Sequence, residues 1–384
     1  MTRRCILHVG APKTGTTYLQ DILWASPRAL HDQGFRLPMR SSEDHFFLTL
    51  ALRGRLDPAV DPPRAIDVLD RLRKDLRKSD PHDLLISHEL LAAVEQDRVD
   101  EFMALLGDFE VHVVVTARDL ARQVPAEWQQ QVKTRAELPY ERFVRRVVSG
   151  RAAHFWAVQD VASVAQRWGR HLPPEQVHIV TVPPAGSPPE ELLSRFCTAV
   201  GLGPDDLSRD DARLNQSLGY DQTELLRRIN LALGDRLPHP RNGYGATVKF
   251  WFAEQVLADQ PPRQRLGLPM EHWDWVVGVS KEIVVRIERA GFRVHGELSD
   301  LVPVCEAADV LRRPSEADLT ATGVEVIAAM LADRHLHEGM SWPRRIADLG
   351  RTARHRSHPG RHPISGLAGR RRAATDSMTR MRRA

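Results

Sequence analysis

Residues 4–17 read RCILHVGAPKTGTT, and this stretch decides the fold class that the sequence predicts. The apolar run that ends at Val9 is typical of a buried strand. Apolar side chains at helical spacing begin near Thr16 and stop before Pro27, which predicts a helix over 16–24. A strand, a tight loop and a helix in this order are the opening unit of a parallel α/β sheet.

The rest of the first half continues this alternation. The run FEVHVVVTA at 109–117 is almost continuously apolar, which indicates a strand buried on both faces, as in a parallel sheet. Two other runs, 83–87 and 177–183, predict further strands. Helices are expected between them, at 61–79, 97–107, 119–133 and within 139–170. The predicted fold class is α/β, with a P-loop-like parallel sheet flanked by helices.

Beyond residue 190 the strand signal fades, and the C-terminal half is expected to be largely helical. The helical patterns lie at 190–200, 221–234, 246–258, 272–290 and 316–333. The segment 351–384 lacks apolar periodicity, so we expect a disordered basic tail there. These patterns divide the chain into an α/β domain at 1–300, a helical extension at 301–350 and the Arg-rich tail at 351–384.

The charge is unevenly distributed along the 384 residues. The formal net charge is +4, but ten arginines and only one acid lie in 351–384. Residues 1–350 therefore have 44 basic and 49 acidic side chains, a net charge of −5. This is not the electrostatic footprint of a nucleic-acid binder, and no specific nucleic-acid partner is expected. Two interpretations of the tail stay open, a solvated appendage and a weak contact with an anionic membrane.

The cysteines and the N-terminal sequence indicate the cellular compartment in which the protein is expected. Cys5, Cys197 and Cys305 are far apart and form no CxxC pair, so neither a disulfide framework nor a thiolate metal site is predicted. Buried free thiols in a reducing cytosol are the favoured interpretation. The first apolar run is too short for a secretion signal, and none is long enough to cross a membrane. The sequence thus predicts a cytoplasmic protein.

The loop GAPKTGTT at 10–17 carries the clearest chemical signal. Small residues, main-chain N–H groups at a helix N-terminus and Lys13 form a cradle suited to phosphate or sulfate. Lys13 precedes the second glycine by two positions, whereas in the nucleoside-triphosphate loop GxxxxGK[ST] the lysine follows it. The pattern therefore argues against a kinase.

The hexapeptide at 12–17 resembles the PK(S/T)GTT loop of sulfotransferases that use 3′-phosphoadenosine 5′-phosphosulfate (PAPS). The resemblance implies that the 5′-phosphosulfate is bound by Lys13, Thr14, Gly15, Thr16 and Thr17. It gives Lys13 a catalytic role as well, neutralising charge on the bridging oxygen of the leaving phosphate. The implied reaction transfers a sulfuryl group from PAPS to a hydroxyl, or less readily an amine, of a small-molecule, glycan or lipid acceptor, without a metal ion.

The strand at 109–117 supplies a second part of the resemblance. In this family, a strand-end arginine binds the 3′-phosphate together with a serine eight residues later. Arg118 fits the arginine, but Ala126 stands at the serine position, so half of this clamp is missing. Gln129, Gln130 and Lys133 on the same helix are candidates to compensate. Without the loop upstream, a surface ion pair would be the default interpretation of Arg118.

The general base is sought just after the strand 83–87, at the carboxyl edge of the sheet. Enzymes that resemble this one use Glu or His there. We favour Glu89, with a pKa raised by partial burial, and place His88 second. Only one of the two side chains can face the site if the strand continues through both.

Two other histidines are weaker catalytic candidates. His45 is interpreted as a helix-surface residue, and His8 as a packed strand residue. The tryptophans Trp128, Trp156 and Trp168 could stack on adenine, but such residues on amphipathic helices are more often part of the core.

Two later segments have weaker signals. Residues 214–219, LNQSLG, are assigned a helix-capping and packing role, and Arg241-Asn242-Gly243 is the nearest candidate for a basic loop over the 3′-phosphate. A second functional hypothesis stays open, a sulfotransferase-like fold that binds a nucleotide or partner without catalysis; its best support is Ala126. No spacing rule identifies the acceptor.

Overall fold

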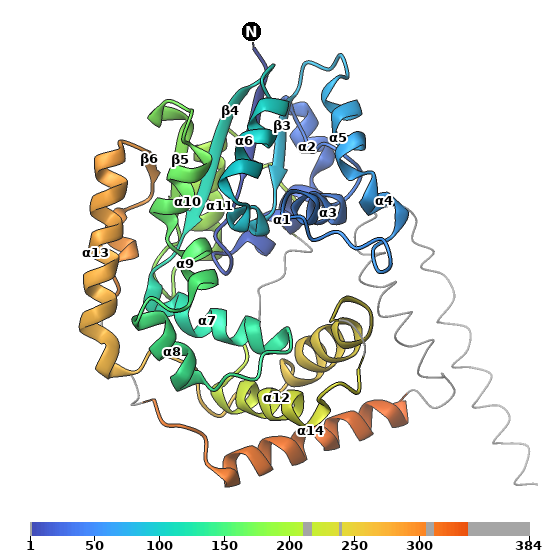
Figure 1. Cartoon of the computed structure of the whole chain (residues 1–384), viewed down its shortest axis with the longest axis vertical. Coiled ribbons are helices and arrows are strands. Elements are labelled where there is room, and N and C mark those ends of the chain that lie inside the picture. Colours follow the sequence, from blue (N-terminus) through green and yellow to red (C-terminus); the bar gives the residue numbers. More distant parts are fainter. Residues whose placement is uncertain (1, 210–216, 238–239, 305–310, 337–384) are drawn as a thin grey trace, which may run out of the picture.

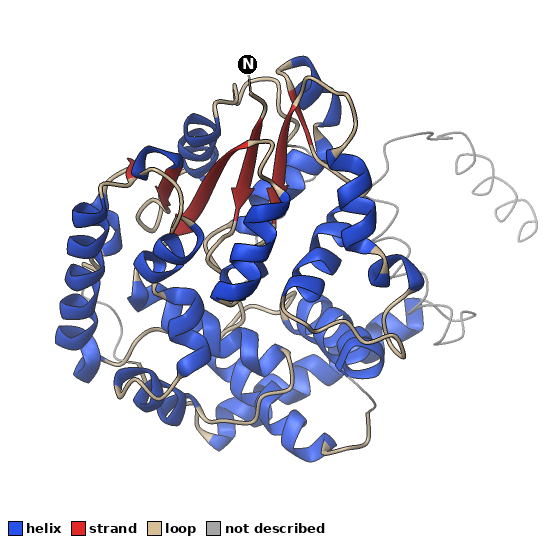
Figure 2. Cartoon of the chain, turned by 45° about the horizontal axis from the view of Figure 1, so that its top comes forward, coloured by secondary structure: helices blue, strands red, loops and turns tan. Residues whose placement is uncertain are grey.

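The computed structural model describes residues 2–209, 217–237, 240–304 and 311–336. Its centre is a six-stranded, all-parallel sheet in the order β2-β3-β1-β4-β5-β6 (Figure 1 and Figure 2). The strands are β1 Arg4–His8, β2 Phe35–Arg36, β3 Asp83–Ser87, β4 Glu110–Ala117, β5 Val177–Thr181 and β6 Arg293–His295. The predicted α/β class with a parallel sheet is confirmed.

Helices surround this sheet. The first half contains α1 Thr16–Ala25, α2 Pro27–Asp32, α3 Ser42–Leu52, α4 Pro63–Ile66, α5 Val68–Leu76, the 3₁₀ helix η1 Glu89–Ala93, α6 Gln96–Leu105, α7 Leu120–Lys133, α8 Tyr140–Val148, α9 Ala153–Gln159 and α10 Val161–Trp168. The second half contains η2 Pro174–Gln176, α11 Pro189–Val200, α12 Tyr220–Leu233, the π-helix η3 Pro240–Leu257, η4 Met270–His272, α13 Trp273–Ala290, η5 Leu298–Leu301 and α14 Glu316–Leu336.

Alternate residues of the central strands enter two separate cores, one on each face of the sheet. Ile6, Leu85 and Val114 pack with apolar residues of α1 and α11. Leu7 and Ile86 belong to the larger core on the other face, which includes side chains from α6 and α10. Each fully buried side chain of this kind contributes about 1.5–3 kcal/mol relative to exposure. This two-sided burial explains why these strands are recognisable as apolar runs.

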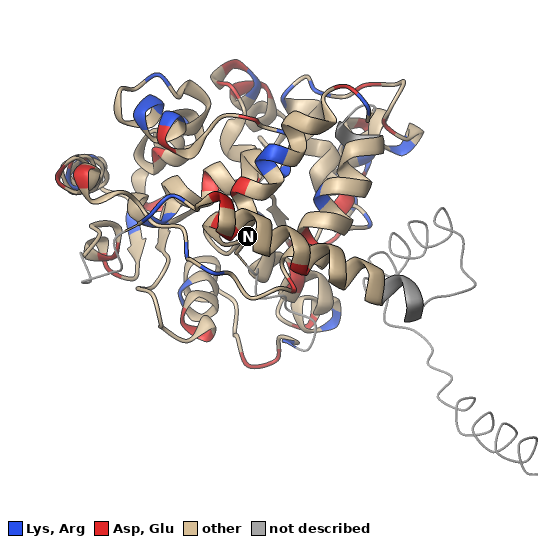
Figure 3. Cartoon of the chain, turned by 90° about the horizontal axis from the view of Figure 1, so that it is seen from below, with Lys and Arg blue, Asp and Glu red and all other residues tan. Residues whose placement is uncertain are grey.

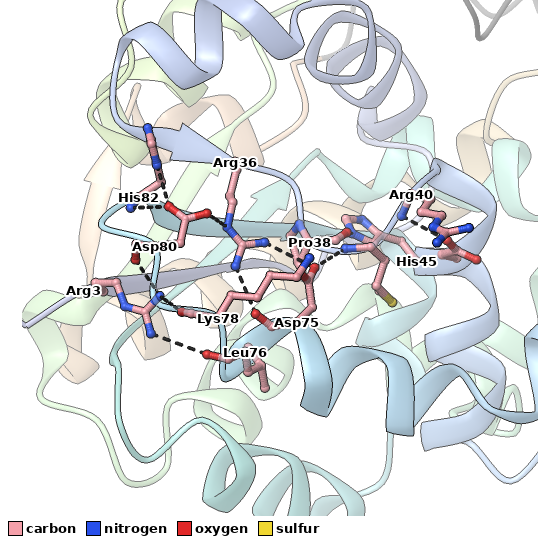
Figure 4. Close-up of polar contacts among 12 residues, drawn as sticks. Arg3, Arg36, Pro38, Arg40, His45, Asp75, Leu76, Lys78, Asp80 and His82 are labelled. Atoms are coloured by element: carbon pink, nitrogen blue, oxygen red, sulfur yellow. Dashed lines mark hydrogen bonds and ion pairs between the residues drawn. The ribbon is translucent and has the colours of Figure 1, made fainter.

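Two edge strands were not predicted. β2 has two residues, and Arg36 fixes it by bonding to the Asp75 side chain at 3.2 Å and to Asp80 at 2.8 Å (Figure 4). β6 has three residues that are exposed or half-buried, and it is a short strand within the C-terminal half, which is largely helical as predicted. Both strands are too short to leave a periodic signal, and pairing with a central strand defines them.

The later helices form a layer next to α7. α12 packs against α7, and α14 packs against α12 and η3 (Figure 1). The hydroxyl of Thr322 donates to the carboxylate of Asp221 at 2.8 Å, which links α14 to α12. The helix predicted at 246–258 is part of the longer η3, a π-helix.

Several predictions lie wholly or partly outside the described residues. The tail at 351–384 and the last part of the extension at 301–350 are not described, so the disordered tail and its membrane contact stay predictions, as do the domain boundaries. Cys5 and Cys197 are buried free thiols, as expected, while Cys305 is not described. Within the described ranges, no helix is long and apolar enough to cross a membrane. Basic and acidic segments are interleaved in the view from below (Figure 3).

Candidate active site

The loop between β1 and α1 turns through three left-handed residues. Their φ angles are 83° at Gly10, 66° at Lys13 and 83° at Gly15. The left-handed conformation costs a non-glycine residue about 1–2 kcal/mol, so the surrounding structure must hold Lys13 in place. Gly15 is the N-cap of α1 and provides no side-chain cap, which leaves the first main-chain N–H groups of α1 available to a ligand.

The loop is tied to β4 by a buried hydroxyl pair. The Thr14 Oγ1 donates to the Ala11 carbonyl at 2.6 Å and lies 2.5 Å from the Thr116 Oγ1. The N–H of Ala11 donates to the Thr116 carbonyl at 2.9 Å. The Thr14 hydroxyl is therefore engaged inside the protein, so ligand binding predicted for this residue falls to its main chain.

His8 contacts the same pair of hydroxyl groups through Thr116. Its Nδ1 lies 2.8 Å from the Ser87 Oγ, and its Nε2 lies 3.3 Å from the Thr116 Oγ1. Burial lowers the pKa of His8 to about 4, so the ring is neutral at pH 7. The interpretation of His8 as a packed strand residue agrees with this geometry.

Two amide side chains anchor the loop from another side. Gln123 on α7 donates to the Pro12 carbonyl at 2.9 Å, and Gln159 at the end of α9 donates to the same oxygen at 3.3 Å. Gln123 also donates to the Oε1 of Gln159 at 2.7 Å. Neither residue could be predicted from the sequence, because a glutamine on an amphipathic helix carries no signal for a contact more than 100 residues away.

Lys13 is half-buried at the crest of the loop, and its ammonium group has no hydrogen-bond or ion-pair partner within the described chain. Burial, and then the nearby Lys133, lower the pKa of Lys13 to about 8. The group is mostly charged at pH 7 and available to an anion. Beside it, Thr16 is buried and Thr17 is half-buried.

Arg118 lies directly after β4 and meets this loop. Its Nη1 donates to the Lys13 carbonyl at 3.3 Å, across 105 positions of sequence. Its Nε is buried without a hydrogen-bond partner, and burial lowers the pKa of Arg118 to about 10. No described carboxylate forms an ion pair with it, so the surface-ion-pair interpretation does not hold. An orphaned guanidinium N–H beside an anion cradle fits a bound phosphate.

The candidates to replace the missing serine are not equivalent. Ala126 is half-buried on α7 and has no polar atom in its side chain. The Gln129 amide is buried and donates to the Leu218 carbonyl at 2.6 Å, so it is already engaged. Gln130 is half-buried. Lys133 is buried, and its ammonium has no partner among the residues that the structure describes.

His88 and Glu89 lie beyond the end of β3, so the alternation expected of a strand does not apply to them. The N–H of Leu90 donates to the Nδ1 of His88 at 3.1 Å, which makes His88 the cap of η1. Gln20 on α1 donates to the Glu89 carboxylate at 3.1 Å. The His88 Nδ1 is 3.7 Å from a Glu89 oxygen, so both side chains belong to one cluster.

Glu89 also touches the anion loop. A Cβ added to Gly10 would lie 2.7 Å from the Glu89 Cα, closer than real Cβ contacts. Burial raises the pKa of Glu89, but His88, the Gln20 amide and Lys13 lower it by more, so the net direction is downward. The expectation of a raised pKa is therefore wrong, and Glu89 is an ionised carboxylate at neutral pH. Burial lowers the pKa of His88.

His45 is not a helix-surface residue, and that expectation is wrong. It lies in α3 with a relative exposure of 1%. Its Nε2 lies 3.1 Å from the Pro38 carbonyl (Figure 4), and the Ser87 N–H donates to its Nδ1 at 3.3 Å. Burial lowers its pKa to about 4. Both ring nitrogens are engaged with the main chain, which leaves no free nitrogen for a substrate.

The tryptophans are mainly core residues, as expected. Trp128 and Trp168 are fully buried, and the half-buried Trp156 donates to the Val147 carbonyl at 3.1 Å. In the segment 214–219, Gly219 is the N-cap of α12, which confirms a capping role there; residues 214–216 lie outside the described chain.

The proposed basic loop is wrong as a loop, because Arg241-Asn242-Gly243 lies within η3. In the described part of the chain, no group of three or more His, Cys, Asp or Glu side chains could hold a metal ion.

In this α/β protein, the loop that carries Lys13 and the free N–H groups at the start of α1 lies at the point where the strand order reverses around β1. No protein-family model matches the chain, and no curated protein matches it.

Solved structures similar to it include two sulfotransferases. A sulfotransferase from Alicyclobacillus acidocaldarius aligns at 13% identity with a TM-score of 0.42, covering 76% of this chain and 97% of that one. The sulfotransferase domain from the curacin biosynthetic pathway aligns at 16% identity with a TM-score of 0.30, covering 54% and 78%. Likenesses at this level do not establish a shared activity, so only the site's own residues bear on it.

Proposed function

We propose that this protein is a sulfotransferase that moves a sulfuryl group from PAPS to a hydroxyl acceptor, with an amine as the less favoured acceptor. The observation that carries the proposal is the bond from Arg118 to the Lys13 carbonyl. It joins the strand-end arginine and the anion loop, two separate parts of the sequence pattern, at one edge of the sheet.

The donor would be held by groups that lack partners in the described chain. The main-chain N–H groups of Gly15, Thr16 and Thr17 would bind the 5′-phosphosulfate together with the Lys13 ammonium. Arg118, with its unpaired buried Nε, would bind the 3′-phosphate. The glutamines at Pro12 and the hydroxyl pair at Thr14 hold the loop in place before any ligand binds, which favours catalysis by pre-organisation.

PAPS supplies the sulfuryl group on a phosphate leaving group. The new bond forms between the acceptor oxygen and sulfur, the bond between sulfur and the bridging oxygen breaks, and the hydroxyl proton passes to Glu89. Its carboxylate is ionised at neutral pH and can accept that proton, with a lowered pKa that makes it a weaker base than a free glutamate, and His88 is the second candidate for this role. Lys13 would stabilise the charge that develops on the leaving phosphate.

The alternative of a non-catalytic binding protein has one specific support, since Ala126 leaves half of the 3′-phosphate clamp without a polar side chain. Catalysis is favoured over this alternative because Glu89 lies against the loop at Gly10, while Arg118 bonds to the same loop at Lys13. The acceptor is proposed to be a hydroxylated small molecule, glycan or lipid.

Two measurements test the proposal. Thermal unfolding with adenosine 3′,5′-bisphosphate should show stabilisation that exceeds that with ATP and magnesium, because a ligand raises stability by preferential binding to the native state. Radiolabelled PAPS with a panel of hydroxylated acceptors should show label transfer that is lost in Lys13→Ala. Lys281→Ala, on the exposed face of α13, is the matched control. Stabilisation by ATP with magnesium alone would contradict the proposal.

A further inference from the structure

A second cation lies beyond the donor site, at the last residue of α7. Lys133 has a relative exposure of 9%, and its ammonium forms no hydrogen bond or ion pair with another described residue. Burial lowers its pKa, and nearby Lys249 lowers it further while Glu254 opposes the shift. The carbon chain of Lys133 is buried while its ammonium keeps access to solvent, so the ammonium is available to bind an anion.

The π-helix η3 brings Lys249 to the same place. The Tyr244 hydroxyl lies 2.6 Å from the Asn230 Oδ1 and 3.3 Å from the Val132 carbonyl, which fixes η3 beside the end of α7. Lys249 follows Tyr244 by five residues, about one turn of a π-helix. Its Nζ lies 4.8 Å from the centre of the Phe250 ring, and the two lysine ammonium groups repel each other.

The neighbouring carboxylates do not neutralise these lysines. Glu254 acts on Lys133 electrostatically but is itself exposed, and no ion pair joins any described carboxylate to either lysine. Glu127 is buried on α7, accepts a hydrogen bond from Gln131 at 3.1 Å, and has a pKa raised by burial. The negative charge of Glu89 raises the pKa of Lys13, against the effect of the two lysines. Within the described residues, neither lysine is therefore paired with a carboxylate.

The position of Lys133 separates it from the 3′-phosphate. Arg118 precedes the first turn of α7, and Lys133 ends the helix, whose 14 residues span about 20 Å. The charges that act on Arg118 are those of Arg122 and Asp119, whereas Lys133 and Lys249 both act on Lys13. Lys13 therefore lies between a donor end and a second cationic end.

We propose that Lys133 and Lys249 bind an anionic group of the acceptor, a carboxylate, phosphate or sulfate, so that the enzyme sulfates a molecule that is already negatively charged. This inference rests on the proposed sulfuryl transfer and specifies its substrate class. The two lysines would set the binding of the acceptor and leave the donor bound as before.

The first test is calorimetric titration of inorganic phosphate into the full chain saturated with adenosine 3′,5′-bisphosphate. We expect the wild type to bind phosphate, and the double variant Lys133→Met with Lys249→Met to bind it at least 10-fold more weakly, with adenosine bisphosphate affinity unchanged. Lys281→Met is the control and should behave as wild type. Equal phosphate binding in the double variant, absent binding in the wild type, or a matching loss of adenosine bisphosphate affinity would each overturn the proposal.

The second test uses label transfer to matched pairs of hydroxylated carboxylic acids and their methyl esters. The wild type should label the acids in preference to the esters, and the double variant should lose that preference through a raised KM for the acids. Equal labelling of acids and esters by the wild type would overturn the inference. The proposed function would instead be contradicted if adenosine 3′,5′-bisphosphate did not bind or if no label were transferred. In that case, phosphate titration of the free protein, wild type against the double variant, would still decide the role of the lysines.

Discussion

The two ends of α7 differ in how their polar side chains are used. At the first end, Asp119 caps the helix and pairs with Arg122, and Gln123 donates to the loop carbonyl of Pro12. At the last end, Lys133 is buried with no partner in the described chain. The first group of side chains bonds within the protein and positions the loop, whereas the Lys133 ammonium is left available to an anion. The paired side chains at the first end thus fix the loop, while Lys133 remains free to contact a ligand.

The largest expected effect concerns the proton acceptor beside the scaffold end. Glu89→Gln should lower kcat for sulfuryl transfer by about 10²–10⁴-fold, because it removes the carboxylate that takes the proton. With the pKa of Glu89 lowered, the acid limb of the wild-type kcat/KM profile should lie below the ordinary value of 4.5. A rate that survives in Glu89→Gln but is lost in His88→Ala would assign the base to His88.

The free energy of unfolding should also decrease in acid. Burial lowers the pKa values of His8 and His45 from 6.5 to about 4, so between these values the unfolded chain binds more protons than the folded one. Stability should therefore fall as pH falls from about 6.5 towards 4, by about 2 kcal/mol per histidine between pH 7 and 5. Urea unfolding at several pH values measures this slope. The variant His8→Gln with His45→Gln should flatten it, and an unchanged slope would refute the assignment.

The contact between the loop and Glu89 can be broken at Gly10. Gly10→Ala combines a left-handed φ with a Cβ 2.7 Å from the Glu89 Cα, so we expect a loss of about 2–3 kcal/mol of unfolding free energy. The matched control is Gly34→Ala, since Gly34 has a similar φ of 81° but no atom within 4 Å of its added Cβ. The control should cost about 1 kcal/mol. Equal losses in the two variants would show that the approach to Glu89 imposes no constraint.

The smallest expected effect separates charge from geometry at Arg118. Arg118→Lys keeps the charge but loses the planar fork, so the Kd for adenosine 3′,5′-bisphosphate should rise about 10-fold. The same change should leave phosphate binding at Lys133 and Lys249 unaltered, because those lysines lie at the other end of α7. If this variant lost affinity for both adenosine 3′,5′-bisphosphate and phosphate, the two ends of α7 would belong to one binding site.

Local patterns in the sequence were sufficient for the scaffold end. The strand at 83–87 has the bounds predicted, and α1 and α7 begin or end within one residue of theirs. These elements are buried on a regular face, so their periodicity is visible. The loop at 10–17 could likewise be placed, because it follows directly from the first strand.

Features that depend on distant packing could not be predicted. The burial of His45 follows from α3 packing against the end of β3, and the lowered pKa of Glu89 depends in part on Gln20, 69 positions away. Lys133 and Lys249 meet only because α7 and η3 pack together. Nothing in their local sequence distinguishes them from exposed lysines.

In the proposed function, Arg118 and the loop around Lys13 form one donor site that recognises a 3′-phosphate. Calorimetric titration of the wild type with adenosine 3′,5′-bisphosphate and with adenosine 5′-monophosphate tests it most directly, since the two ligands differ only in that phosphate. A charge-assisted contact of about 1.5–3 kcal/mol predicts roughly 10–100-fold tighter binding of the bisphosphate. Equal affinities for the two ligands would contradict the account.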